Sequence, residues 1–290
     1  GTFTYAPPAG TLLNAGTQPL SATFRAADTE HYFQTITLTQ SLAVAKSPQT
    51  INLPSFGTVT YGDPPITISA TASSGLPVTL SVTGPAVLSG NTLTFMAPGL
   101  VEIDAFQAGN SNYLATSAFR LMNVAKINPV ITWATPTNIV YGTALSSAQL
   151  NADCAVPGTF TYSPLAGTVL DAGTRTLSVT FTPDDTVNYA AVTATQTLVV
   201  SKATQTITFP APPNPTFGDP PFGVSATASS GLPVTFSILG GPATISGSTV
   251  TLTGAGIVSV RALQSGNVNY LSNSVTRTFT VARATPTIAW

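Results

Sequence analysis

The chain has 290 residues, of which 43% are hydrophobic and only 7% are charged, and its formal net charge at pH 7 is −1. This composition excludes a disordered chain, which would be poor in apolar residues and rich in net charge. Because the nine Lys and Arg residues are scattered singly, it also argues against a nucleic-acid or anionic-membrane surface, and the apolar runs are too short for a transmembrane helix.

Two sequence motifs recur at nearly the same interval. The motif "GTFTY" stands at 1–5 and 158–162, and "SATASSGLPVT" stands at 69–79 and 225–235, so the offsets are 157 and 156 residues. A basic residue closes each of four shorter units, at Lys46, Lys126, Lys202 and Arg283. These closures are 80, 76 and 81 residues apart, which suits a small seven-strand sandwich.

In chain order the sequence therefore predicts five segments. Residues 1–46 are a partial repeat of type 1 that lacks its first strands, and 47–126 are a complete repeat of type 2. Residues 127–202 are a complete type 1 repeat, 203–284 are a second type 2 repeat, and 285–290 are the first strand of a further repeat. The first four segments are called repeats 1 to 4 below, and we expect the chain to be a section of a longer array.

Within the repeats, apolar residues alternate with polar ones, as at Leu177, Val179 and Phe181, which is the pattern of a half-buried strand. Gly- and Pro-rich turns such as "GDPP" separate the strands, and we expect the Asp63 and Asp219 side chains to stabilise these turns. The linkers are only one or two residues long. The predicted fold class is all-β, with tandem immunoglobulin-like β-sandwiches arranged as an elongated array.

The ordered motifs of repeat 3 resemble those of a known family. They are "ITW" at 131–133, "YGTAL" at 141–145, "VPGTFTYSP" at 156–164, "TLSVTFTP" at 176–183 and "NY" at 188–189. This set is similar to the bacterial immunoglobulin-like repeats of the mostly-β (MBG) type, which occur in very long surface or secreted proteins. The resemblance covers essentially the whole chain and implies an exported stalk, often adhesin-like, without enzymatic activity.

The candidate catalytic and metal-binding residues do not recur between the repeats. His31 is the single histidine, and its counterpart in repeat 3 is Asn188, so neither a catalytic triad nor a multi-histidine site can be built. Asp184 and Asp185 are adjacent in a loop and are weak candidates for calcium, but the matching pair in repeat 1 is Ala27 and Asp28. We expect no enzyme activity, no cofactor and no other metal.

Three aromatic residues precede a glycine and are the candidates for an exposed ligand-binding ladder: Tyr61, Tyr141 and Phe217. Other aromatic residues are expected to be structural. One tyrosine recurs before the last strand of each repeat and is expected to plug the end of the sandwich while its hydroxyl bonds backbone; these are Tyr32, Tyr113, Tyr189 and Tyr270. Trp133 is expected in the core, because type 2 repeats have Leu53 and Phe209 at its position.

The sequence favours a structural stalk or spacer in a bacterial cell-surface or secreted protein, located outside the cell. One alternative is a set of weak carbohydrate- or glycan-binding repeats that gain avidity from repetition. A second alternative is the subunit of an extracellular filament built by strand exchange. The expected partners are the neighbouring repeats of the same chain, with a surface glycan or another copy of the chain as further options, and neither nucleic acid nor membrane insertion.

Overall fold

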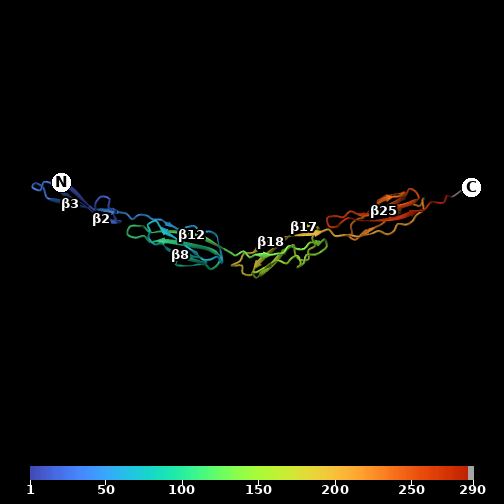
Figure 1. The fold of residues 1–290 in the computed structure, drawn as a ribbon, viewed down its shortest axis with the longest axis horizontal. Helices are drawn as coiled ribbons and strands as arrows, with labels where there is room; N and C mark the ends of the chain where they lie inside the picture. The colour runs from blue at the N-terminus through green and yellow to red at the C-terminus, as the bar shows by residue number, and fades with distance from the viewer. Residues whose placement is uncertain (287–290) are drawn as a thin grey trace. The chain divides into compact units, whose positions relative to one another are not determined.

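The computed structural model of the chain describes residues 1–286, so most of the strand expected at 285–290 lies outside the described residues. All the regular elements within this range are β-strands, which confirms the all-β fold class (Figure 1). No helix in residues 1–286 is long and apolar enough to cross a membrane. The chain divides into two compact units, Gly1–Asn128 with Asp185–Ala190 and Pro129–Asp184 with Ala191–Trp290, and each unit is described by itself.

Repeat 1 contributes a single antiparallel sheet to unit 1. Its strands, in the order β1-β2-β3, are β1 (Thr2–Ala6), β2 (Gly16–Arg25) and β3 (Thr35–Val44). The register places Phe24 opposite Phe3 on one side and Ile36 on the other, so the apolar side chains of the three strands share one face. The described residues contribute no second sheet to this repeat.

Repeat 2, also in unit 1, is a two-layer sandwich. Its strands are β4 (Ile51–Asn52), β5 (Val59–Thr60), β6 (Ile66–Thr67), β7 (Thr71–Ala72), β8 (Thr79–Thr83), β9 (Ala86–Ser89), β10 (Thr92–Phe95), β11 (Gly99–Gln107) and β12 (Thr116–Ala125). One layer is the sheet β5-β12-β11-β8, and the other holds β4-β7 and β6-β10-β9. Because β6 and β7 are two parts of one Ig strand, B, this order matches strands A-B-E-D facing the G-F-C sheet of an immunoglobulin-like sandwich.

The core of repeat 2 lies between these two layers. On β11 the alternate residues Val101, Ile103 and Ala105 have no exposed surface, and neither have Ile68 and Leu93 of the facing layer. Burial of such apolar side chains contributes about 1.5–3 kcal/mol for each of the larger ones, so this interface is the main source of the repeat's stability. The residues between them on β11 point to the outer side of the sheet.

Repeat 3, in unit 2, has a smaller second layer than expected. Its strands are β13 (Ile131–Thr132), β14 (Ile139–Val140), β15 (Asp153–Cys154), β16 (Gly158–Ser163), β17 (Gly173–Pro183) and β18 (Val192–Ser201). The sheet β14-β18-β17-β16 faces only the pair β13-β15 and a single bridge between Ala144 and Val169. The expectation of seven strands is therefore wrong for this repeat, because buried Leu145 and Leu150 fill the core from a loop instead of a strand.

Repeat 4, also in unit 2, reproduces the sandwich of repeat 2. Its strands are β19 (Ile207–Thr208), β20 (Phe222–Gly223), β21 (Thr227–Ala228), β22 (Thr235–Gly240), β23 (Ala243–Ser246), β24 (Thr249–Leu252), β25 (Gly256–Gln264) and β26 (Asn273–Val281). The sheet β22-β25-β26 faces β19-β21 and β20-β24-β23. A parallel bridge between Thr216 and Ala282 stands where β5 pairs with β12 in repeat 2.

The "GDPP" turns form as the sequence predicts. The Asp63 Oδ2 atom accepts the Thr60 N–H at 2.8 Å, and Asp219 Oδ2 accepts the Thr216 N–H at the same distance. The glycine before each aspartate has a positive φ, 93° in the first turn and 105° in the second, which a residue with a side chain rarely adopts. The aspartate side chain thus stabilises both turns.

Candidate functional site: the F–G loops at the repeat junctions

The loop between β11 and β12, residues 108–115, holds the segment through which the chain enters repeat 2. We call it the F–G loop of that repeat. The Ser47 N–H donates to the carbonyl of Asn112 at 2.8 Å, and the Leu114 N–H donates to the carbonyl of Ser47 at 2.9 Å. Ser47 follows the lysine that closes repeat 1, so both backbone groups of this linker residue are bonded.

The F–G loop of repeat 4, residues 265–272, does the same in unit 2. The Ala203 N–H donates to the carbonyl of Asn269 at 2.8 Å, and the Leu271 N–H donates to the carbonyl of Ala203 at 2.9 Å. A flexible linker has a solvated backbone without fixed partners. The segment that joins repeats 3 and 4 is instead part of the folded structure.

In unit 2 the side chain of Asn269 extends this contact into repeat 3. Its Oδ1 atom accepts the Ala172 N–H at 2.8 Å, and its Nδ2 atom donates to Asp171 Oδ1 at 2.9 Å. We call this pair of hydrogen bonds the amide clamp. Ala172 and Asn269 are both buried, so the hydrogen bonds replace water for these groups. Arg175 supports the turn from within repeat 3, since its Nε donates to the Asp171 carbonyl at 2.8 Å and its Nη2 to the Ala172 carbonyl at 3.0 Å.

The amide clamp also occurs in unit 1, 157 residues earlier. Asn112 Oδ1 accepts the Ala15 N–H at 2.8 Å, and Asn112 Nδ2 donates to Asn14 Oδ1 at 2.9 Å. Gln18 takes the place of the arginine, with its Nε2 donating to the Asn14 carbonyl at 2.9 Å. The acceptor here is a neutral amide instead of a carboxylate, so the hydrogen bond is expected to be the weaker of the two.

A buried network of glutamines shapes the F–G loop of repeat 2. Gln49 Nε2 donates to Gln107 Oε1 at 2.5 Å and to the Leu114 carbonyl at 2.6 Å. Ser74 Oγ donates to Gln49 Oε1 at 2.5 Å, and the Gly109 N–H donates to Gln107 Oε1 at the same distance. We call this the glutamine network; it joins the segment that precedes β4, the turn at residues 73–77 and both ends of the F–G loop.

Repeat 4 has the same glutamine network. Gln205 Nε2 donates to Gln264 Oε1 and to the Leu271 carbonyl, both at 2.6 Å, while Ser230 Oγ donates to Gln205 Oε1 at 2.5 Å. The Gly266 N–H donates to Gln264 Oε1. Both glutamines are buried, and a satisfied buried network of this kind holds one loop conformation. The loop that carries Asn269 is therefore fixed from inside its own repeat.

Two of the three lysines that close the repeats also bind F–G loops. In unit 1, Lys126 Nζ donates to the Thr186 carbonyl at 2.5 Å, and in unit 2, Lys202 Nζ donates to the Asn267 carbonyl at 2.6 Å. Both contacts are exposed to solvent, so each is worth little in stability by itself. They place a positive charge on the loop at each of these two positions.

The loop 185–190, which belongs to unit 1, is organised by a carboxylate. Asp185 Oδ1 accepts the N–H groups of Asn188 at 3.0 Å and Val187 at 3.1 Å, and Oδ2 accepts Asn188 Nδ2 at 2.9 Å. These hydrogen bonds, with the backbone bond from Asn188 the strongest influence, lower the pKa of Asp185 below its ordinary value. Ile127 bonds the same loop through the Asn188 carbonyl and the Ala190 N–H, both at 2.9 Å.

The three aromatic residues predicted as a ligand-binding ladder differ in exposure. Tyr61 is partly buried against the core of repeat 2, and Tyr141 is partly buried against the core of repeat 3. The Tyr141 ring also meets that of Tyr270 edge-on, with centroids 5.4 Å apart. Phe217, at 43% exposed, is the most open of the three. A glycan-binding role for these residues stays a prediction.

Three of the four recurring tyrosines lie at junctions between repeats, where their backbone makes the contact. Parallel bridges join Tyr113 to Ser47, Tyr189 to Ile127 and Tyr270 to Ala203. These three are partly buried, whereas Tyr32 of repeat 1 is 69% exposed. Trp133 is buried in the core of repeat 3, and its Nε1 donates to the Gln149 carbonyl at 3.0 Å.

The two calcium candidates differ in what their carboxylates bind. The Asp185 carboxylate accepts hydrogen bonds from its own loop, while the Asp184 side chain is exposed. Within residues 1–286 no group of three or more His, Cys, Asp or Glu side chains is placed to hold a metal ion. His31 is exposed and pairs with Asp28, Nδ1 to Oδ2, at 3.1 Å. Calcium binding at the two aspartates stays a prediction.

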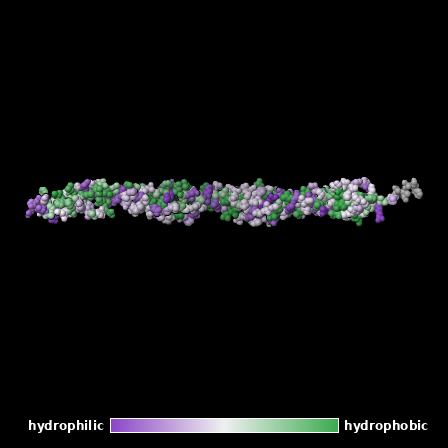
Figure 2. Space-filling model, turned by 90° about the horizontal axis from the view of Figure 1, so that it is seen from above, coloured by the Kyte–Doolittle hydropathy of each residue, from purple (hydrophilic) through white to green (hydrophobic). Residues whose placement is uncertain are grey.

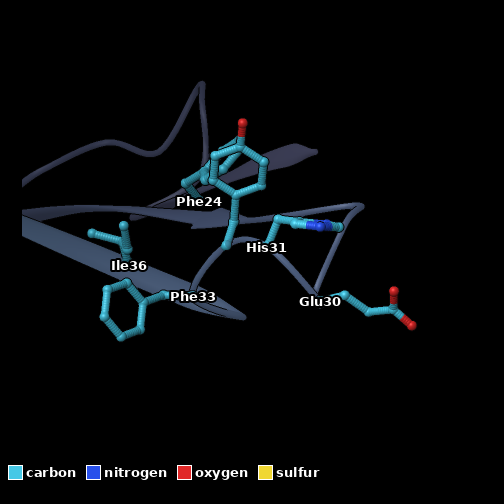
Figure 3. A pocket seen from close by; sticks show the side chains of 6 residues that line it. Phe24, Glu30, His31, Phe33 and Ile36 are labelled. Carbon is cyan, nitrogen blue, oxygen red and sulfur yellow. The ribbon is translucent and has the colours of Figure 1, made fainter.

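The sheet of repeat 1 exposes an apolar face. Phe3 and Tyr5 are 62% and 59% exposed, whereas their counterparts Phe160 and Tyr162 pack against the core of repeat 3 or its neighbouring rings. Figure 3 shows Phe33 and Ile36 beside one another in a pocket at the end of this face, with the Glu30 carboxylate pointing away. Strand exchange with another copy of the chain would use this exposed face, and this role stays a prediction.

Sequence reasoning missed the polar residues of the junctions. One glutamine of each network, Gln107 or Gln264, and the clamp asparagine stand in stretches that recur almost unchanged, "FQAGNSNY" at 106–113 and "LQSGNVNY" at 263–270. A polar side chain that recurs at the same place in two copies is a signal that could have identified these residues, as it identifies the tyrosine of each motif. The preceding asparagine and glutamine carry the contacts.

Comparisons with known proteins find distant structural similarity only. No family model matches the chain, and no curated protein matches it. Among solved structures, Drosophila N-cadherin domains EC1–4 are 12% identical, cover 93% of this chain and 84% of that chain, and give a TM-score of 0.32. Sidekick-1 immunoglobulin domains 1–5 are 12% identical, with 93% and 67% covered and a TM-score of 0.33. Surface layer protein SbsC, domains 1–6, is 12% identical, with 96% and 46% covered and a TM-score of 0.26.

Proposed function

We propose that the chain is a structural spacer of the MBG type in an exported bacterial surface or secreted protein. Its task would be mechanical: to hold whatever it carries at a fixed distance by joining immunoglobulin-like repeats without free linkers. The proposal assigns the chain no reaction, cofactor or metal, and its repeats correspond to the segments 1–46, 47–126, 127–202 and 203–284. The site of this function is the F–G loop.

One observation carries the proposal: the amide clamp of unit 2 is repeated in unit 1 with the same atoms. In both units an asparagine side chain accepts a backbone N–H 97 residues away at 2.8 Å. A hydrogen bond to a backbone group from another repeat limits rotation at the junction between the two repeats. Hydrogen bonds of this kind contribute about 0.5–1.5 kcal/mol each, so a junction with several of them favours one arrangement.

Small-angle X-ray scattering of the whole chain tests the spacer. A stiff array should give the profile of an extended particle that changes little with temperature below unfolding. Replacing both clamp asparagines, Asn112 and Asn269, with Ala should leave each repeat folded by circular dichroism but increase the flexibility seen in the scattering. A compact globular profile of the unmodified chain would contradict the proposal.

A second candidate function, weak glycan binding, is favoured by the exposure of Phe217. A ring that is 43% open to solvent next to a tight turn is a plausible stacking surface for a sugar. Depletion of the chain by insoluble polysaccharides, with and without calcium, measures such binding. If Phe217→Ala and Tyr141→Ala both leave any binding intact, these aromatic residues are not the site.

A further inference from the structure

The outer side of the sheet β5-β12-β11-β8 in repeat 2 combines carboxylates with exposed apolar side chains. Glu102 and Asp104 point outward from β11, and the register places Leu121 opposite Glu102 and Phe119 opposite Asp104. Phe119, Leu121 and the neighbouring Phe106 are 57%, 55% and 50% exposed. We call these five residues the acidic face. Such an exposed set of large apolar residues in one patch is a sign of an interaction surface.

The matching side of the sheet β22-β25-β26 in repeat 4 carries the opposite charge. Arg261 stands where repeat 2 has Asp104, with Ser237 and Thr276 directly opposite it on the two neighbouring strands. Ser259 replaces Glu102, and the apolar Ile257, 68% exposed, lies at the edge of the same face. We call these five residues the basic face. The two type 2 repeats therefore carry faces with the same strand pairing and opposite charge.

Arg261 is partly exposed, and one nitrogen of its guanidinium group lacks a hydrogen-bond partner. Its Nε atom is buried and has no hydrogen-bond partner, and the same is true of Ser237 Oγ directly across the sheet. A buried polar atom without a partner is unfavourable. The Nη atoms of this partly exposed side chain are not buried in this way, so they are the donors that an acceptor from another chain can reach. Within residues 1–286 neither Glu102 nor Asp104 forms a salt bridge with a Lys, Arg or His side chain.

We propose that the acidic face of one copy of this chain binds the basic face of a second copy. The carboxylates of Glu102 and Asp104 supply the acceptors that Arg261 lacks, and guanidinium binds carboxylate well because two parallel hydrogen bonds can form. An inorganic anion would satisfy Arg261 but leave Phe106, Phe119 and Leu121 in water. A second copy covers the charges and the apolar side chains together.

Each copy carries one face of each kind, so the proposed contact joins two different surfaces of the same chain. The net charge of −1 leaves little repulsion between copies. The apolar side chains supply the burial, and the charge pair fixes which faces meet. The proposed pairing of two chains is separate from the spacer role and does not depend on it.

Sedimentation velocity of the whole chain over a wide concentration range tests this pairing at low and high salt. The unmodified chain should form dimers at high concentration, and salt should weaken them because the Debye length falls from about 30 Å at 0.01 M to about 3 Å at 1 M. Arg261→Asp and Asp104→Arg should each raise the dissociation constant more than about tenfold, because each opposes like charges. The double variant Asp104→Arg with Arg261→Asp should restore dimers.

Matched controls separate the two faces from net charge alone. Arg25→Asp and Glu30→Arg change the net charge equally at exposed positions of repeat 1, and both should dimerise like the unmodified chain. Ser259→Glu adds a negative charge to the basic face without removing Arg261, and it should also weaken the dimer. A chain that stays monomeric at every concentration overturns the proposal, as does a dimer that Asp104→Arg and Arg261→Asp leave unchanged.

Discussion

The side-chain oxygen of Asn269 accepts the backbone N–H of Ala172 at 2.8 Å, although the two residues are 97 positions apart and belong to different repeats. Asn112 and Ala15 repeat this relationship at the same separation and distance in unit 1. A bond of this kind makes the stability of one repeat depend on the other. Variants of these residues and of their neighbours test that dependence and the contacts that support it.

Asn269→Ala should destabilise unit 2 by about 1–3 kcal/mol, because the buried Ala172 N–H loses its acceptor. Urea denaturation followed by tryptophan fluorescence would measure the change through Trp133, which lies in the core of repeat 3. Asn151→Ala is the matched control, since Asn151 is exposed in the same repeat as Ala172. Equal stability of the two variants would show that the clamp contributes nothing measurable.

Asn269→Asp keeps the acceptor for Ala172 but removes the N–H group that binds Asp171. It also places a second carboxylate beside that of Asp171, so we expect a larger loss of thermal stability than Asn269→Ala causes. Adding Asp171→Asn should recover most of the loss, because the new amide can donate to the aspartate, in the opposite direction to the hydrogen bond that Asn112 donates to Asn14 in unit 1. A double variant no more stable than Asn269→Asp alone would argue against this contact.

Gln264→Met should loosen the F–G loop of repeat 4 without unfolding the sandwich. The change has nearly the same volume but leaves the Gly266 N–H and one donor of Gln205 without an acceptor, at a cost of about 1–3 kcal/mol. Hydrogen exchange of the loop amides 266–271 should become faster, while that of the buried strand β25 should change less. Gln34→Met, at an exposed position, serves as the control. Unchanged exchange in the loop would contradict its support by the network.

Protonation of Asp185 should weaken the hydrogen bonds of the loop 185–190 only at low pH. The pKa of Asp185 is lowered in the folded protein, so the folded state binds its proton less readily than the unfolded state. The stabilisation is therefore complete above the unfolded-state pKa and is lost as the pH falls through the lower folded-state pKa. The NMR shifts of the Val187 and Asn188 amides should follow this titration, and Asp185→Asn should abolish it. A midpoint at or above that of an aspartate in an unfolded peptide would contradict the prediction.

The sequence was sufficient for the strands and turns but not for the junctions. Alternation on β11 and β17 follows from local chemistry, and Asp63 stabilises its turn within three residues, so both can be inferred from neighbouring positions. The short second layer of repeat 3 could not be inferred, because Leu145 and Leu150 reach the core from a loop without a strand pattern.

The contacts of the candidate site join residues that are far apart in the chain. Gln49 meets Gln107 across 58 positions, and Asn269 meets Asp171 across 98. Nothing in the local sequence of an asparagine or glutamine specifies such a partner, since the same side chain is as common on an exposed loop. Recurrence between the two type 2 repeats marks these residues, and only the fold shows what they bind.

Pulsed electron spin resonance within unit 2 tests most directly whether the F–G loop fixes the junction. Spin labels at exposed Thr161 on β16 and Thr251 on β24, with Cys154 replaced by Ala, report the distance between repeats 3 and 4. A fixed junction predicts a narrow distance distribution that Asn269→Ala broadens while both repeats stay folded. A distribution already broad in the chain with Asn269 intact would contradict the account.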